Sequence, residues 1–181
     1  MILQRYKIVF GGTIGAGKSA AIRALSDTSV LSTEALNTDR EASAKTLTTV
    51  GIDYGEIRLD DEITIGLYGT PGQNRFDFMW EIVCKGALGI IILIDHTRPE
   101  RLQDLDFYLN AFEKYSHNLV IGVTHLDKQD DQMLKIYRDW FAVRQLNYPL
   151  FVVDARQKDD VLLMTEALIA TAEINSLNVE N

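Results

Sequence analysis

Eight consecutive residues near the start of the chain have the types and spacing needed to hold phosphate groups. They read Gly12-Thr13-Ile14-Gly15-Ala16-Gly17-Lys18-Ser19, a complete G-x-x-x-x-G-K-[ST] pattern. Glycines permit tight turns and close approach, so that successive backbone N–H groups can point at phosphate oxygens. Lys18 can then bridge the outer phosphates, and the Ser19 hydroxyl can bind Mg²⁺. The segment therefore predicts a nucleotide site.

The flanks of this segment also suit a phosphate site. A β-rich run at residues 6–10 precedes it, and a helix is expected to begin at its end, where the helix N-terminus adds partial positive charge. The alternative is a glycine-rich strand–helix turn with an accidental lysine, which the correct flanks disfavour. We expect the following residues to contact the nucleotide: Gly12, Gly15, Ala16, Gly17, Lys18, Ser19 and Ala20.

Strands and helices alternate along the rest of the chain. The expected strands are residues 6–10, 51–59, 63–68, 89–95, 119–124 and 150–155. The second and third flank an acidic turn and read as a hairpin, whereas the last three are continuous apolar runs typical of inner parallel strands. The sequence thus predicts an α/β protein with a mostly parallel six-stranded sheet, one antiparallel strand and helices on both faces.

Three amphipathic helices are expected to cover this sheet. Their apolar stripes are Leu102, Leu105, Leu109 and Phe112, then Met133, Ile136, Tyr137, Trp140 and Phe141, then Val161, Met164, Leu168 and Ala172. We interpret these stripes as core. Residues 1–181 are expected to form a single domain of three layers, with its ligand in the crevice beyond the carboxyl ends of the strands.

Composition narrows the function classes. The 181 residues carry a formal net charge of −8, with 26 acidic and 18 basic residues, so nucleic acid and anionic lipid are disfavoured as partners. The single cysteine, Cys84, cannot form an internal disulfide, and we interpret it as a small core or interface residue. The sequence shows no signal-peptide pattern and no lipidation motif, so we expect a cytoplasmic protein without a direct lipid anchor.

Two later segments resemble a known family. Residues 49–54, TVGIDY, are similar to the P-T-I-G-V-D-F stretch of Rab and Arf-like GTPases, and residues 68–76, YGTPGQNRF, to their W-D-T-A-G-Q-E-R-F. With the phosphate segment, this order and spacing identify the chain as a member of the Ras superfamily of small GTPases, with the P-loop NTPase fold. The L-Y-x-x-P-G-Q pattern resembles the bacterial MglA-like GTPases most.

The resemblance implies roles for the switch residues. Thr49 would bind Mg²⁺ and sense the γ-phosphate, Gly72 would donate its backbone N–H to that phosphate, and Gln73 would orient the attacking water. Arg40, in a T-D-R element similar to that of MglA-like proteins, is a candidate arginine finger, with a solvated loop arginine as the alternative and Arg75 as second choice. By itself, the Thr-Pro-Gly-Gln segment could equally be a surface turn.

Two further elements would choose the base. Thr124-His125-Leu126-Asp127 matches the position of N-K-x-D, and Asp154-Ala155-Arg156 resembles S-A-K. The Asp127 carboxylate can accept from the paired donors of guanine, which adenine lacks, although it could instead cap a helix. The Ala155 N–H would meet the guanine carbonyl, and Arg156 completes this element. Thr124 and His125 replace the usual Asn and Lys, which predicts a lowered affinity.

One departure concerns the metal. The family's D-x-x-G aspartate is Gly69 here, so Mg²⁺ would depend on Ser19, Thr49 and another carboxylate such as Asp95. We therefore expect a GTP/GDP- and Mg²⁺-dependent switch that hydrolyses GTP slowly and acts through protein effectors and regulators, with a roadblock-fold protein as one candidate. The alternatives are a nucleotide-dependent scaffold with negligible hydrolysis and a P-loop ATPase or kinase.

Overall fold

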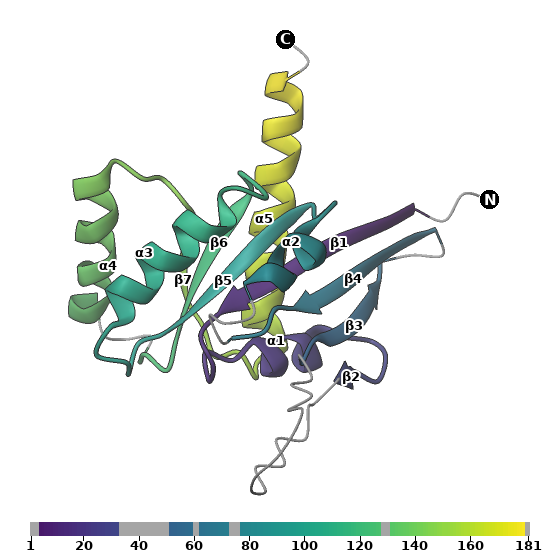
Figure 1. Cartoon of the computed structure of the whole chain (residues 1–181), viewed down its shortest axis with the longest axis horizontal. Coiled ribbons are helices and arrows are strands. Elements are labelled where there is room, and N and C mark those ends of the chain that lie inside the picture. The colour runs from purple at the N-terminus through teal and green to yellow at the C-terminus, as the bar shows by residue number, and fades with distance from the viewer. Residues whose placement is uncertain (1–3, 33–50, 60–61, 73–76, 128–130, 180–181) are drawn as a thin grey trace, which may run out of the picture.

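The computed structural model describes residues 4–32, 51–59, 62–72, 77–127 and 131–179. Its centre is a seven-stranded sheet in the order β2-β3-β4-β1-β5-β6-β7 (Figure 1). The strands are β1 (Gln4–Gly12), β2 (Leu31–Ser32), β3 (Asp53–Arg58), β4 (Ile63–Gly69), β5 (Gly89–Asp95), β6 (Leu119–Thr124) and β7 (Leu150–Val152). The α/β fold with a mostly parallel sheet is confirmed.

The sheet contains four parallel pairs of neighbouring strands and two antiparallel pairs. β4, β1, β5, β6 and β7 pair in parallel, whereas β3 runs antiparallel to β4, as the hairpin prediction required. The seventh strand, β2, pairs antiparallel with β3 at the sheet edge. The sequence reading missed it because two exposed residues carry no alternation of apolar and polar side chains.

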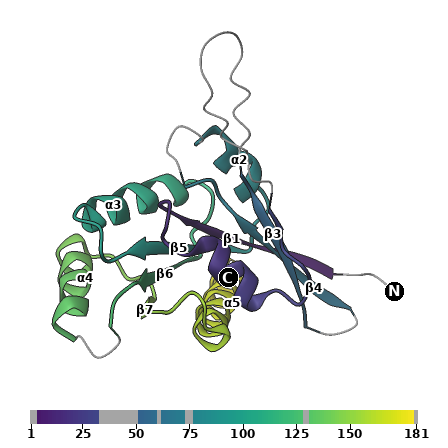
Figure 2. The ribbon, with the colours of Figure 1, turned by 90° about the horizontal axis from the view of Figure 1, so that it is seen from below.

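Helices cover both faces of the sheet (Figure 2). One face packs against α1 (Lys18–Leu25) and α5 (Lys158–Val179), and the other against α2 (Phe78–Cys84), α3 (Arg101–Phe112) and α4 (Asp131–Arg144). Strand residues alternate between the two layers, so that Phe10 joins the first core cluster and Val9 the second. Within the described ranges, no helix offers an apolar stretch that would cross a lipid bilayer.

Most residues of the apolar stripes lie in the core, whereas Leu102 and Ile136 are half-buried and Met133 is exposed. The stripe of α5 is buried, and the side chains of Leu105, Leu109 and Phe112 in α3 are at most 3% exposed. Met133 of α4 was predicted to be core, but it is 37% exposed. The prediction was wrong because Met133 lies in the first turn of α4, and the helix packs on its neighbours through the later residues Tyr137, Trp140 and Phe141.

The packing of β1 against α3 gives a stability prediction. A Cβ on Gly11 would lie 2.3 Å from Cε2 of the fully buried Phe112 ring. Gly11→Ala should therefore lower the free energy of unfolding by about 1–3 kcal/mol, measured by urea denaturation. Because the two side chains would clash directly, Gly11→Ala combined with Phe112→Leu should cost less than the sum of the single changes. Strict additivity would contradict this contact.

Candidate functional site

The loop between β1 and α1 has the shape of a phosphate cradle. Its glycines Gly12, Gly15 and Gly17 have φ values of 130°, 82° and 100°. These left-handed conformations are ones that side-chain-bearing residues rarely adopt. At Gly12 the requirement is also steric, because a Cβ there would lie 2.1 Å from the Leu93 carbonyl oxygen. The loop can therefore turn tightly against β5 only with glycine at this position.

Lys18 lies buried inside this loop. Its Nζ donates to the carbonyl oxygens of Gly12 and Thr13, at 2.7 and 2.6 Å. Removal from water lowers the pKa of Lys18 from its usual value to about 8, although the carboxylate of Asp53 works in the opposite direction. An ammonium has three N–H donors, so two bonds to carbonyls leave one for another acceptor. A buried cation so placed is suited to an anionic ligand.

Two more features of the loop fit a phosphate. The first turn of α1 has no side chain capping its N-terminus, where Gly17 occupies the cap position, so its N–H groups face the loop. The Thr13 hydroxyl is buried and has no hydrogen-bond partner among the described residues. Free donors beside a buried cation are the groups that phosphate oxygens require. The residues of the loop therefore fit the ligand that the sequence predicts.

The segment after β6 is tied to the phosphate loop by two side chains. The Thr124 hydroxyl donates to the Ala16 carbonyl oxygen at 3.0 Å, and Nε2 of His125 lies 3.1 Å from the Gly15 carbonyl oxygen. Because a carbonyl oxygen only accepts, this His125 nitrogen carries the proton in that bond. His125 also has a left-handed backbone, with φ of 58°. These bonds fix the segment that begins at Thr124 relative to the phosphate loop.

A pocket of about 420 Å³ opens between these loops and the end of β7. It is lined by Gly15, Gly17, Ala20, Thr124, His125, Leu126, Val153, Asp154, Ala155 and Arg156. The tertiary structure thus brings together seven of the predicted nucleotide contacts from three separate segments. Asp127 follows Leu126 directly and is exposed, outside the lining residues. The Arg156 side chain is 78% exposed and forms a bidentate ion pair with Asp154.

Sequence reasoning missed one residue at the other end of the loop. The Ser19 hydroxyl donates to a carboxylate oxygen of Asp53, the first residue of β3. The suggested alternative, Asp95, instead accepts from the backbone and hydroxyl of Thr97 within its own turn. Asp53 is part of the TVGIDY segment, but the sequence alone does not show that this residue contacts Ser19. The contact depends on the register of β3 against β4.

The switch residues are described only in part. Gly72 lies against the phosphate loop, since a Cβ there would be 2.7 Å from the Ile14 nitrogen and 2.9 Å from Lys18 Nζ. The Tyr108 hydroxyl donates to the Gly72 carbonyl oxygen at 3.3 Å. The other predicted switch residues, Arg40, Thr49, Gln73 and Arg75, lie outside the described residues.

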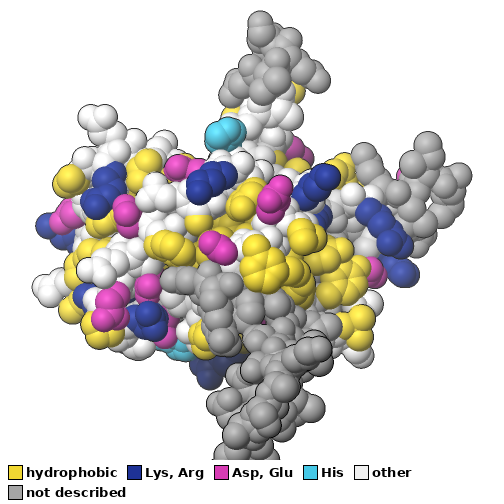
Figure 3. All heavy atoms as spheres, in the orientation of Figure 1, with side chains coloured by type: hydrophobic (Ala, Val, Ile, Leu, Met, Phe, Trp, Pro, Cys, Tyr) yellow, Lys and Arg dark blue, Asp and Glu magenta, His cyan; other side chains and the backbone are white. Residues whose placement is uncertain are grey.

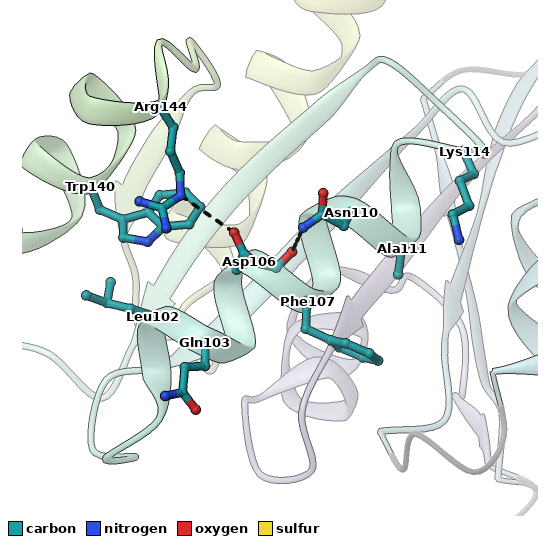
Figure 4. A pocket seen from close by; sticks show the side chains of 9 residues that line it. All are labelled: Leu102, Gln103, Asp106, Phe107, Asn110, Ala111, Lys114, Trp140 and Arg144. Carbon is teal, nitrogen blue, oxygen red and sulfur yellow. Dashed lines mark hydrogen bonds and ion pairs between the residues drawn. The ribbon is translucent and has the colours of Figure 1, made fainter.

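A larger hollow of about 720 Å³ lies between α3 and α4 (Figure 4). Figure 4 shows Arg144 reaching from α4 toward Asp106 on α3, an ion pair of 3.6 Å, and its guanidinium lies 4.0 Å above the Trp140 ring. Ligands on such sheets bind beyond the carboxyl ends of strands, and this hollow is framed by the sides of two helices. Its size alone does not make it the functional site.

Comparison with known proteins shows that the sequence is similar to those of Ras-related proteins. Ras-related protein Rab-18 of Lymnaea stagnalis is 25% identical over 93% of this chain and 80% of its own length. Ras-related protein Rab-27A of Sus scrofa is 24% identical over 81% of this chain and 75% of its own length. An uncharacterized protein of Methanocaldococcus jannaschii is 32% identical over 83 residues, 45% of this chain, and the match spans about half (53%) of that protein.

A solved structure shares the fold. The G domain of the T. maritima FeoB iron transporter superposes with a TM-score of 0.62 at 18% identity, over 93% of this chain and 99% of that one. The relatives support membership of the P-loop GTPase superfamily, whereas the MglA-like assignment stays a prediction. A family model described as "Conserved hypothetical ATP binding protein" matches residues 28–177. The chain belongs to this family of conserved hypothetical ATP-binding proteins.

Proposed function

We propose that this chain binds GTP and GDP together with Mg²⁺, hydrolyses GTP slowly and acts as a molecular switch toward protein partners. The observation that carries the proposal is the junction of the two loops. A buried Lys18 in the phosphate-binding loop lies next to a pocket, and two residues that line this pocket, Thr124 and His125, are hydrogen-bonded to the loop. A nucleotide would place its phosphates on the first loop and its base in the pocket.

Base choice would depend on Asp127 and Ala155. A carboxylate beside the pocket can accept both the ring N–H and the exocyclic amino group of guanine. The Ala155 residue lines the pocket, and its backbone N–H would donate to the guanine carbonyl oxygen. Adenine offers an amino group at that place, which also donates and so could not pair. These two groups favour guanine over adenine.

Hydrolysis would depend on positioning and charge neutralisation. Lys18 would hold the outer phosphates, the Gly72 N–H would donate to the γ-phosphate, and Gln73 would orient the attacking water. Mg²⁺, when bound, would neutralise the negative charge that develops on the phosphate oxygens. Ser19 and Thr49 are its proposed protein ligands. Arg40 is the candidate for a further positive charge on the transferred group.

The proposed switch needs a surface that partners read. Large apolar side chains are exposed on α2, where Phe78 and Ile82 are 59% and 64% accessible, and on α3, where Phe107 is 40% accessible. Figure 3 shows apolar side chains gathered over the middle of the face that carries α2. Exposed apolar patches mark protein interaction sites. The patch begins six residues beyond Gly72, and the MglA-like resemblance suggests a roadblock-fold protein as one partner.

Two alternatives have observations of their own. The family description names ATP, which favours an adenine nucleotide as ligand. The absence of a carboxylate at Gly69 favours a scaffold that binds nucleotide with negligible turnover. Base preference distinguishes the first from our proposal, and single-turnover hydrolysis distinguishes the second.

The first experiment is competition for fluorescent GDP by unlabelled GTP, GDP and ATP in the presence of Mg²⁺. Guanine nucleotides should compete and ATP should not. Asp127→Asn should weaken GDP binding about 10–100-fold, because a charged hydrogen-bond acceptor is lost. The same variant should bind xanthosine diphosphate better than the wild type does, because the new amide donor can face the added ring carbonyl. Equal competition by ATP would refute the guanine assignment.

A second experiment tests the proposed water-orienting residue. Gln73→Leu should slow single-turnover GTP hydrolysis by about 10²-fold, because the attacking water loses its orienting group. The affinity for GDP should stay unchanged and serves as the control. An unchanged hydrolysis rate would remove Gln73 from the mechanism.

The lowered pKa of Lys18 predicts proton uptake on binding. In the free protein, Lys18 is half deprotonated near pH 8, and bound phosphates favour its charged form. GDP binding at pH 8 should therefore take up about half a proton, and the affinity should fall by up to about tenfold per pH unit above pH 8. Calorimetry at pH 8 in two buffers of different ionisation enthalpy measures this uptake. At pH 7 the uptake should nearly vanish, and equal uptake at both values would contradict the linkage.

A further inference from the structure

One carboxylate lies at the metal side of the phosphate loop. The Ser19 hydroxyl, in the first turn of α1, donates to Oδ2 of Asp53. The other carboxylate oxygen of Asp53, Oδ1, accepts from the Ser32 hydroxyl at 2.5 Å. Asp53 is half-buried, and each of its two oxygens has a hydroxyl partner. The carboxylate is therefore held in one orientation toward Ser19.

Asp53 borders the space that a side chain at position 69 would enter. The two residues are directly opposite in the antiparallel register of β3 and β4, so their side chains share one face of the sheet. A Cβ on Gly69 would lie 3.1 Å from Cδ1 of Ile22, 3.3 Å from the Asp53 Cβ and 3.5 Å from the Asp53 Oδ2. A carboxylate side chain at either position, 53 on β3 or 69 on β4, would therefore lie near Ser19.

We propose that Asp53 helps Ser19 to hold Mg²⁺, and so supplies from β3 the carboxylate that P-loop GTPases take from the strand end occupied here by Gly69. The inference rests on the proposed function, because the Mg²⁺ would be that of the bound nucleotide. Asp53 is a positioning residue, since it would act on the metal and not on the reacting phosphate.

The chemistry of the corner suits this role. Mg²⁺ takes oxygen ligands and keeps several waters, so one hydroxyl and one nearby carboxylate complement the phosphate oxygens of a nucleotide. The described residues contain no cluster of three His, Cys, Asp or Glu side chains that could hold a metal without such a ligand. Ser32 supports the carboxylate from behind, as outer-shell partners of metal ligands do.

The test follows the release of fluorescent GDP from the full chain at a series of free Mg²⁺ concentrations. In the wild type, rising Mg²⁺ should slow release. In Asp53→Asn, which keeps the side-chain shape but removes its charge, the half-effective Mg²⁺ concentration should rise about 10–100-fold. In EDTA the two proteins should release GDP at similar rates, because the change concerns only the metal.

Matched variants separate the charge from its position. Asp53→Asn combined with Gly69→Asp should recover most of the Mg²⁺ response, because the carboxylate returns from the opposite strand. Asp53→Asn combined with Gly69→Ala adds only the Cβ and should not recover it. Asp95→Asn, which removes the other carboxylate considered, should leave the Mg²⁺ response as in the wild type. Thermal melting checks that each variant is folded.

If Asp53→Asn fails to fold, Ser32→Ala provides a milder variant, because Ser32 is exposed and only supports the carboxylate. It should raise the half-effective Mg²⁺ concentration in the same direction by about threefold or more. A wild-type Mg²⁺ response in Asp53→Asn, or loss of the Mg²⁺ response in Asp95→Asn, would overturn the role proposed for Asp53 and leave the proposed function standing. Failure of the wild type to bind any guanine nucleotide would overturn the proposed function, and this inference with it.

Discussion

The burial of the Lys18 ammonium at the start of α1 is the interaction on which the rest of the site depends. A cation removed from water needs oxygen partners, and the Gly12 and Thr13 carbonyls provide two of them. Those carbonyls point inward only because the loop passes through left-handed glycine conformations. The position of the lysine and the shape of the loop are therefore one constraint. The same arrangement favours an anion in the space that the loop encloses.

The order of the strands places Thr124 and His125 beside the phosphate loop. β5 lies between β1 and β6, so the phosphate loop and the segment after β6 emerge at the same edge. Thr124 and His125 then bond to backbone carbonyls of the loop. A backbone carbonyl requires only a donor of suitable length, and a threonine hydroxyl and a histidine N–H both supply one. The bonds of these two side chains to the loop concern the position of the segment, and the lowered nucleotide affinity expected from the two replacements stays a prediction.

Strand pairing also determines which side chains lie near Ser19, at the other end of the phosphate loop. A metal site needs oxygen atoms at given points in space, and neighbouring strands can supply them interchangeably. Because Asp53 and Gly69 are cross-strand partners, the carboxylate that we propose for the metal lies on β3, directly opposite the glycine of β4. The hairpin thus gives the chain two possible positions for one carboxylate. The two positions are 16 residues apart in the sequence, so a sequence motif that covers only one strand does not include both of them.

The sequence by itself determined what depends on near neighbours in the chain. The phosphate loop follows from glycine spacing, and the bounds of β5 and β6 were predicted to the residue because continuous apolar runs end sharply at Asp95 and Thr124. Only the tertiary structure decided the pairing of β2, the exposure of Met133, the pocket shared by three segments and the meeting of Asp53 with Ser19. The physical reason is that register and packing are set by contacts between residues distant in sequence, whose side chains carry no local sign of their partners.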